Sequence, residues 1–486
     1  MCSNASASVA NTSSAKLKNI EAAQSPDATM NGLNESSSLP SADSRSSGVV
    51  DGSGLSAARH LAARGWQLTV TDTRPEPPGA ADIARIAPQV SCRFGGFDSA
   101  LLDGADIVVA SPGVSLAEPL LREAQARGIE IVGDVELFAR EVRAPVVGIT
   151  GTNGKSTVTT LVGRMAARAG VHVAVGGNLG TPALDLLGQG EPSLYVLELS
   201  SFQLETTSSL RLQAGAVLNL TADHLDRYAD MAGYGAAKAR IFMHCAVAVV
   251  NLDDPHVTSM PASVGLVGCD RIRGFSIEGC AEAEYHLIER DGAMWLAVSG
   301  EPLMPVSAMR LPGLHNAANA LAALALGDAV GLPREAMLAE LREFTGLPHR
   351  SQWVGEHEGV RYINDSKGTN VGATLAAVGG MPGPLVLIAG GDGKAQDFSA
   401  LSSALAGKLR FAALIGRDAA QLAAALAPVC PVQTYASLEA AVVGAAQHAR
   451  QGDTVLLSPA CASLDMFRDY AHRGDVFAAA VQGLSS

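Results

Sequence analysis

One stretch of the sequence constrains the fold more than any other, residues 145–159, which read PVVGITGTNGKSTVT. Its first half is a short apolar run, typical of a strand buried in a parallel sheet. A glycine-rich turn follows, and the chain then enters a pattern typical of a helix. Such a strand, loop and helix N-terminus form a cradle for a nucleoside triphosphate, because their backbone N–H groups can face its phosphates. The residues that we expect to bind the triphosphate are Gly151, Thr152, Asn153, Gly154, Lys155, Ser156 and Thr157.

Two side chains of this loop carry the predicted chemistry. Lys155 is expected to neutralise the β- and γ-phosphates, and Ser156 is expected to ligate Mg²⁺. The strict pattern G-x-x-x-x-G-K-[ST] requires glycine where this chain has Ile149, so the generic motif is not matched. An ordinary glycine-rich turn is the alternative, but lysine and serine directly after the last glycine favour a phosphate site.

The length and composition of the chain indicate how many domains it has and which classes of protein it can belong to. A chain of 486 residues, of which 48% are hydrophobic, is expected to hold several domains of roughly 100–200 residues each. The formal net charge of −13 disfavours a nucleic-acid partner, which requires clustered lysine and arginine. The seven cysteines are scattered and form no C-x-x-C pair, as is typical of reduced intracellular thiols. Because no apolar run is long enough to span a bilayer, we expect a cytoplasmic protein without membrane insertion.

The chain divides into four segments by composition and by the order of its apolar runs. Residues 1–48 are rich in serine, alanine and asparagine, lack periodicity and are predicted to be disordered. Residues 49–133, 134–346 and 347–486 each alternate strand and helix patterns, and the run GLPHRS at 346–351 is expected to be a hinge. The predicted fold class is α/β with three domains: a Rossmann-like N-terminal domain, a central P-loop-type ATPase domain and a Rossmann-like C-terminal domain.

The N-terminal domain lacks part of its expected pattern. A dinucleotide-type βαβ unit needs a strand and a G-x-G-x-x-G turn before its first helix, whereas this chain has only DGSG, at 51–54, after a serine-rich segment. We therefore expect the first strand of this domain to be degraded. The next predicted strand, over 67–73, carries Asp72 near its end, and this residue could serve either a ligand or an ordinary turn.

Polar side chains follow the predicted strands of the central domain. Glu198 ends one strand and His224 follows the next. Beside a phosphate loop such groups can hold Mg²⁺, although a helix-cap role explains Glu198 equally well. Lys238, on a predicted helix, is by itself most typical of a solvated surface lysine. Asn316 and Asn319 share one face of another helix, either as core hydrogen-bonding groups or as nucleotide contacts.

Three strands of the C-terminal domain end in polar runs that contain glycine or serine: DSKGTN, GGDGK and SPACAS. Because the carboxyl ends of parallel strands meet at one edge of a sheet, these runs predict a ligand-binding edge. Cys461 in the last run could act as a nucleophile. No partner histidine is apparent, so a small buried residue is the favoured interpretation.

Several longer runs, taken together, resemble one enzyme family. In chain order they are TGTNGKST, ELSSFQLE, DHLDRY, YGAAKARI, GLHNAANALAA, LPHR, NDSKGTN, GGDGK and SPACASLDMF. This is the order seen in the Mur ligases of peptidoglycan synthesis, and the set is most similar to the members that add D-glutamate. The resemblance extends from about residue 54 to the C-terminus.

The resemblance implies one domain for a UDP moiety, one for ATP and one for the incoming amino acid. It also implies that ATP, UDP-N-acetylmuramoyl-L-alanine and D-glutamate give ADP, phosphate and the extended product. An acyl phosphate would form first, because a carboxylate is a poor electrophile, and the amino group of D-glutamate would then displace phosphate. We expect ATP and Mg²⁺ as cofactors, these two substrates as partners, and a monomer.

The resemblance also assigns roles to individual residues. The catalytic residues would be Lys155, Glu198, His224 and Lys238, and the metal ligands Ser156, Glu198, His224 and a carbamylated Lys238. Besides the phosphate loop, the ATP contacts would be Asn316, Asn319, Arg350 and Asp365. D-Glutamate would be surrounded by Lys367, Thr369, Lys394, Ser463, Leu464 and Tyr470. The UDP-linked substrate would meet Asp72, Thr73, Arg74, Gly113 and Asn178.

Other functions stay open at this point. A different Mur ligase or a folylpolyglutamate-synthase-like ligase would share the ATP site, but the runs NDSKGTN and SPACAS disfavour both. A non-catalytic nucleotide-binding paralogue is the alternative from another class. The intact catalytic positions favour an enzyme, while the degraded first strand predicts weakened binding of the UDP-linked substrate.

Overall fold

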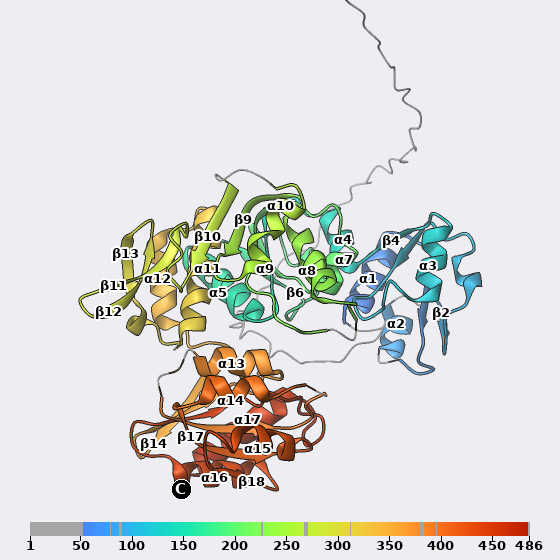
Figure 1. The fold of residues 1–486 in the computed structure, drawn as a ribbon. Coiled ribbons are helices and arrows are strands. Elements are labelled where there is room, and N and C mark those ends of the chain that lie inside the picture. Colours follow the sequence, from blue (N-terminus) through green and yellow to red (C-terminus); the bar gives the residue numbers. More distant parts are fainter. Residues whose placement is uncertain are drawn as a thin grey trace, which may run out of the picture. The chain divides into compact units, whose positions relative to one another are not determined.

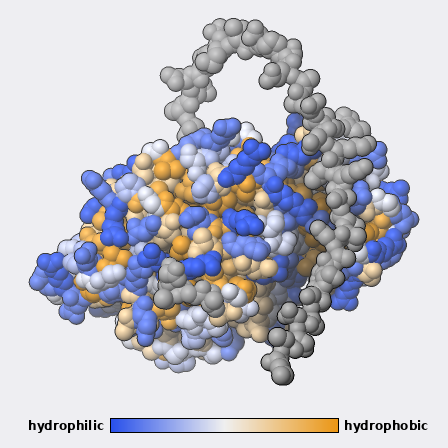
Figure 2. Space-filling model, turned by 90° about the horizontal axis from the view of Figure 1, so that it is seen from above, coloured by the Kyte–Doolittle hydropathy of each residue, from blue (hydrophilic) through white to orange (hydrophobic). Residues whose placement is uncertain are grey.

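The structure, a computed structural model, describes residues 52–484 apart from 78, 87–89, 225–226, 267–270, 312, 380, 382 and 395. The tail predicted to be disordered, 1–48, therefore lies outside the described residues. Within the described part, no helix combines the length and apolarity needed to cross a bilayer. The face drawn in Figure 2 mixes hydrophilic with hydrophobic residues.

The phosphate-loop stretch lies within a large, mostly parallel sheet. Across the described ranges this sheet has nine strands in the order β13-β12-β11-β10-β9-β8-β5-β7-β6. From β6 across to β11 each strand is parallel to the next, whereas β12 is antiparallel to both β11 and β13 (Figure 1). The strands are β5 (Val146–Thr150), β6 (Val173–Gly177), β7 (Leu194–Glu198), β8 (Leu212–Val217), β9 (Cys245–Asn251), β10 (Ile272–Ser276), β11 (Tyr285–Arg290), β12 (Ala293–Val298) and β13 (Glu301–Pro305).

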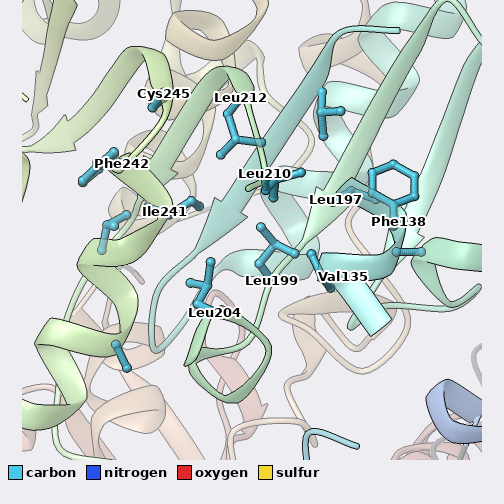
Figure 3. Packing of buried hydrophobic residues seen from close by; sticks show 14 of the residues in the cluster. Val135, Phe138, Leu197, Leu199, Leu204, Leu210, Leu212, Ile241, Phe242 and Cys245 are labelled. Atoms are coloured by element: carbon cyan, nitrogen blue, oxygen red, sulfur yellow. The ribbon is translucent and has the colours of Figure 1, made fainter. Parts of the chain in front are cut away.

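Helices cover both faces of this sheet, which is why β5 and β7 are mostly apolar and are buried along their whole length. Val147 and Ile149 face one core, which α5 and α11 complete, and Val146 faces the other, which α4, α6, α7 and α8 complete. Figure 3 shows the second core, where Phe138 and Val135 of α4 lie near Leu197 of β7. The helices are α4 (Asp134–Ala139), α5 (Lys155–Arg168), α6 (Ala183–Leu186), α7 (Ser201–Glu205), α8 (Met231–Ala239), α9 (Pro255–Thr258), α10 (Met260–Ser263), α11 (Leu314–Ala329) and α12 (Arg334–Glu343).

The C-terminal region forms a second α/β sheet. In the part of the chain that the structure describes, it has six strands in the order β14-β15-β19-β16-β17-β18, all parallel except β14. One core lies against α13, α14 and α15, and the other against α16 and α17. The elements are β14 (Gln352–His357), β15 (Val360–Asn364), α13 (Val371–Gly379), β16 (Leu385–Gly390), α14 (Ser399–Leu405), β17 (Leu409–Ile415), α15 (Ala419–Leu426), β18 (Val432–Thr434), α16 (Leu438–His448), β19 (Thr454–Leu457) and α17 (Tyr470–Gly483).

The N-terminal region contains two separate pairs of parallel strands among its described residues, β1 with β2 and β3 with β4. Residues 107–109 of β3 are only half-buried, in contrast to the fully buried β5. The degraded strand that the sequence predicts before α1 falls on residues outside the described part. The elements are α1 (Gly52–Ala63), β1 (Thr69–Asp72), α2 (Ala80–Ile86), β2 (Ser91–Phe94), β3 (Ile107–Val109), α3 (Pro119–Ala126) and β4 (Glu130–Val132).

The first prediction concerns the strand that carries the phosphate loop. Ile149 is 0% exposed, so Ile149→Ala removes buried methyl groups and leaves a cavity beneath α5. We expect the free energy of unfolding to fall by about 2–5 kcal/mol, measured by urea denaturation. Val443→Ala is the control, because Val443 is 47% exposed and its truncation should change stability by less than about 0.5 kcal/mol. Equal midpoints for the two variants would contradict the placement of β5 in the core.

Candidate active site

The phosphate loop connects β5 to α5 and needs glycine at both of its ends. Gly151 has φ +148° and Gly154, the residue before α5, has φ +83°, in the region that favours glycine. A Cβ atom on Gly154 would also lie 2.6 Å from Oδ1 of Asn319. The loop can therefore bring its backbone close to the side chains of α11, as a phosphate cradle requires.

A residue that the sequence analysis missed holds the loop in shape. Asn219, just after β8, accepts a hydrogen bond from the Asn153 N–H (2.8 Å) and donates one to the Asn153 carbonyl (3.1 Å). Its own carbonyl accepts from the Thr152 N–H at 3.0 Å. Its only sequence signal was its position at a strand end beside β5. This network fixes the loop backbone.

The side chain of Lys155 turns back over the loop. Its Nζ donates to the carbonyls of Gly151 and Thr152, both at 2.9 Å. Burial lowers the pKa of this amine, and the carboxylate of Glu198 opposes that shift. A lysine cation at the mouth of a glycine loop is suited to neutralising phosphate charge.

Ser156 and Glu198, predicted metal ligands, are in direct contact. The Ser156 hydroxyl donates to Oε2 of Glu198 at 2.5 Å, and the side-chain amide of Asn178 donates to Oε1 at 2.7 Å. Glu198 is 3% exposed, so its burial is compensated by hydrogen bonds to both oxygens. A hydroxyl beside a carboxylate fits Mg²⁺, which binds one or two protein carboxylates together with phosphate oxygens and water. Asn178, predicted to contact the UDP-linked substrate, lies at this same carboxylate.

Lys238 is buried, so its interpretation as a solvated surface lysine is wrong. The residue is 1% exposed, and its Nζ donates to the Gly151 carbonyl at 2.9 Å. The amine also lies 4.6 Å from the ring centroid of Tyr234. Burial, and next the charge of Lys155, hold the pKa of the Lys238 amine well below its usual range. Two lysines from different helices thus share one loop carbonyl.

His224 lies on a turn close to this group. It has φ +55°, its ring is edge-on to Phe202 at 5.0 Å, and its Nε2 lies 3.7 Å from Asp223. The described part of the chain contains no group of three His, Cys, Asp or Glu side chains that could hold a metal ion. The second metal expected at His224 therefore stays a prediction.

A cavity of about 300 Å³ opens next to the loop and is of a size that suits a small-molecule ligand. The amides of Asn319 and Asn316 are hydrogen-bonded to each other there at 3.2 Å. Asp365 accepts from the Ser351 N–H and the Ser458 hydroxyl, and burial raises its pKa to about 6. The lining of the cavity includes eight of the predicted site residues: Asn153, Gly154, Thr157, Asn316, Asn319, Arg350, Asp365 and Lys367.

The predicted amino-acid contacts gather at the carboxyl edge of the second sheet. Lys367 Nζ lies 3.9 Å from the ring centroid of Tyr470, and burial lowers its pKa to about 8. Thr369 donates its N–H to the Lys367 carbonyl at 2.7 Å. Ser463 is buried, whereas Leu464 is 73% exposed, and Lys394 is exposed with φ +49°. Because Lys367 is only half-buried and Leu464 and Lys394 are exposed, this edge is accessible to a small ligand.

Arg473 of α17, which the sequence analysis did not single out, joins the three strand-end runs. Its fully buried guanidinium donates to the hydroxyl and carbonyl of Ser366, to the Cys461 carbonyl at 3.1 Å and, more weakly, to the Gly390 carbonyl. Burial lowers the pKa of Arg473 to about 10 and raises that of the Cys461 thiol to about 12. Cys461 is therefore a buried structural residue, as favoured from the sequence.

The residues predicted for the UDP-linked substrate divide into two places. Asp72, at the end of β1, is buried and accepts from Nε (3.0 Å) and an Nη atom (2.7 Å) of Arg74. Thr73 and Gly113 are exposed on the loops after β1 and β3, while Asn178 lies beside Glu198. The structure thus joins two of the predicted substrate contacts, Asp72 and Arg74, by direct hydrogen bonds.

A phosphate loop with paired lysines, a hydroxyl–carboxylate pair and a cavity lined by asparagines defines an enzyme that uses a nucleoside triphosphate. The sequence matches the family models of the MurD-like N-terminal domain (50–133), the Mur ligase middle domain (149–327) and the Mur ligase glutamate ligase domain (349–461). The chain belongs to the Mur ligase family and is an ATP-dependent ligase, and its predicted three-domain α/β fold class is confirmed.

Curated relatives and solved structures agree with this assignment. UDP-N-acetylmuramoylalanine–D-glutamate ligase of Nitrosococcus oceani is 53% identical over 435 residues, which cover 89% of this chain and 95% of the relative. The protein of the same name from Pseudomonas aeruginosa is 51% identical over 437 residues, 89% and 96% of the two chains. The solved UDP-N-acetylmuramate–alanine ligase MurC of Thermotoga maritima shares the fold, with a TM-score of 0.55 at 18% identity over 90% of this chain and 98% of that one.

The second prediction concerns Lys155. Lys155→Ala removes the cation at the point where phosphate charge develops, and we expect turnover to fall about 10³-fold, measured by phosphate release from ATP. Lys408, which directly precedes β17, provides the control, and Lys408→Ala should leave turnover within about twofold of the parent because a partly exposed charge acts weakly at a distance. Near-normal turnover of Lys155→Ala would remove the phosphate-loop assignment.

Proposed function

We propose that the chain joins D-glutamate to UDP-N-acetylmuramoyl-L-alanine, with cleavage of ATP to ADP and phosphate, in the synthesis of a peptidoglycan precursor. The observation that carries this proposal is the 50–53% identity to ligases of that name over about nine-tenths of the chain. The site supports it, because Lys367 lines the cavity beside the phosphate loop and lies near enough to Lys155 of that loop to feel its charge.

The first step is activation of the acceptor. A carboxylate oxygen of UDP-N-acetylmuramoyl-L-alanine attacks the γ-phosphorus of ATP, and the bond to the bridging oxygen breaks to release ADP. Lys155 stabilises the charge that accumulates on the transferred group. Asn316, Asn319, Arg350 and Asp365 hold the adenine nucleoside in the cavity, so that the γ-phosphate projects toward the loop.

The second step forms the amide. The amino group of D-glutamate attacks the acyl carbon, phosphate leaves, and the nitrogen gives up a proton. Lys367, Thr369, Lys394, Ser463, Leu464 and Tyr470 are the proposed contacts of D-glutamate. The ammonium of Lys367 suits a carboxylate ligand, and Tyr470 keeps the lysine side chain in place by stacking against it.

Mg²⁺ is the proposed metal, and Ser156 and Glu198 would hold it, with His224 and a carbamylated Lys238 as the further proposed ligands. When bound, the ion supplies charge stabilisation to phosphate oxygens. Asn178 keeps the Glu198 carboxylate in a fixed orientation through its hydrogen bond to Oε1.

The acceptor would bind with its UDP end at the N-terminal domain. Asp72, Thr73, Arg74 and Gly113 are the proposed contacts there, and Asn178 meets the part of the substrate nearest the phosphate loop. Because Asp72 already fixes Arg74 by a bidentate ion pair, the guanidinium is pre-oriented for a polar ligand.

The third prediction tests the function directly. We expect phosphate release only when ATP, UDP-N-acetylmuramoyl-L-alanine and D-glutamate are all present, measured against a matrix of other UDP-linked acceptors, folate and other amino acids. L-Glutamate is the stereochemical control. Release with folate, or with a longer UDP-linked peptide and a different amino acid, would identify one of the other ligases. ATP binding without turnover in any combination would identify a non-catalytic nucleotide-binding protein.

The fourth prediction concerns the proposed carbamate on Lys238. A buried amine with a lowered pKa is more often neutral, and a neutral amine can add CO₂ with loss of a proton. Lys238→Ala should be nearly inactive and should recover part of its turnover in acetate, which replaces the missing carboxylate. Lys155→Ala is the matched control, because acetate cannot replace a cation. Full activity of Lys238→Ala without acetate would contradict the proposal.

A further inference from the structure

Arg227 makes an unusual set of contacts with three separate segments. One Nη atom donates to the Val114 carbonyl at 3.0 Å and lies 3.3 Å from a carboxylate oxygen of Glu205. The guanidinium also lies over the ring of Phe202, with its carbon 4.8 Å from the centroid. The Arg227 side chain is only 14% exposed, so these contacts replace most of its solvent.

The first of these segments is a tight turn of the N-terminal region. The Val114 N–H donates to the Ser111 carbonyl at 2.9 Å, which closes a turn with Pro112 and Gly113 at its centre. Gly113 is exposed and is a proposed contact of the UDP-linked substrate. The carbonyl that Arg227 binds thus belongs to the residue directly after that contact.

The other segments belong to the central region. Phe202 and Glu205 lie on α7, which begins three residues after Glu198. The Arg227 N–H donates to the His224 carbonyl at 2.9 Å, and the ring of Phe202 contacts that of His224. A single guanidinium therefore connects the turn at Gly113 to the segments that carry Glu198 and His224.

We propose that Arg227 is a positioning residue that fixes the 111–114 turn for the UDP-linked acceptor relative to the phosphate-transfer groups. This inference rests on the proposed function. The planar fork of arginine can bind the Val114 carbonyl and stack on Phe202 at the same time, which lysine cannot do. Glu205 balances the charge, so Arg227 acts through the backbone of the turn and not as a direct ligand of the substrate.

The test compares Arg227→Met with Arg227→Lys and with a matched control, Arg240→Met. Arg240 binds the carbonyls of Leu204 and Thr207, both at 2.7 Å, so it also holds the end of α7 but does not bind the 111–114 turn. Three quantities are measured for each: hydrogen exchange of the 111–115 amides without substrate, and the KM values for the acceptor and for ATP.

We expect Arg227→Met to speed amide exchange at 111–115 and to raise the KM for the acceptor about tenfold, the loss of one charged hydrogen bond. The KM for ATP should not change, Arg227→Lys should be intermediate, and Arg240→Met should leave both the turn and the acceptor KM unaffected. Unchanged exchange at 111–115, or equal increases in both KM values, would overturn the inference. If the parent chain does not use the acceptor, the proposed function fails, and the exchange data alone then decide whether Arg227 holds the turn.

Discussion

The pairing of β5 between β7 and β8 is the constraint on which the rest of the active site depends. Parallel strands in register end at the same edge of their sheet, so the loop after β5 meets Glu198 at the end of β7 and Asn219 after β8. The hydrogen bond from Ser156 to Glu198 then joins the first turn of α5 to the neighbouring strand. Without this pairing, none of these side chains would be near the phosphate loop.

The site concentrates positive charge in a chain whose formal net charge is −13. Burial is the main cause of the lowered pKa values of Lys155, Lys367 and Lys238, and neighbouring cations lower them further: Arg350 acts on Lys155 and Lys367, and Lys155 acts on Lys238. Such mutual repulsion within a buried group costs stability. Binding of anionic phosphates and carboxylates relieves this repulsion. The arrangement that weakens the fold locally therefore favours anionic ligands, and at this site the local positive charge overcomes the negative field of the whole protein.

The N-terminal region differs from the two large sheets in how its strands are buried. β5 and β16 are buried at every residue, whereas β3 is only half-buried throughout and β1 is fully buried only at Asp72. Apolar burial contributes about 25 cal/mol per Å², so these short strand pairs add less stability than a continuous sheet would. The hydrogen bond from Arg227 to the Val114 carbonyl matters more for that reason, because it connects this region to the well-packed central region.

The sequence by itself determined the elements whose signals are local. The apolar run of β5 and the glycine turn before α5 depend on backbone preferences of neighbouring residues, and the structure confirms them. The motif residues of the family were likewise found by their order along the chain. The edge strands β14 and β18 were missed, because their strand character comes from pairing with β15 and β17.

Only the tertiary structure decided which polar side chains are buried and what they bind. Lys238 has the sequence context of a surface lysine, and its burial arises because α8 packs beside the phosphate loop. Asn219 and Arg473 lie outside the motif runs, and Arg227, although it lies in the run DHLDRY, received no role from it, since each of the three binds backbone carbonyls or amides of segments distant in the chain. A hydrogen bond to a backbone group depends on where that backbone lies and not on its side chain, so no pattern in the sequence can predict it.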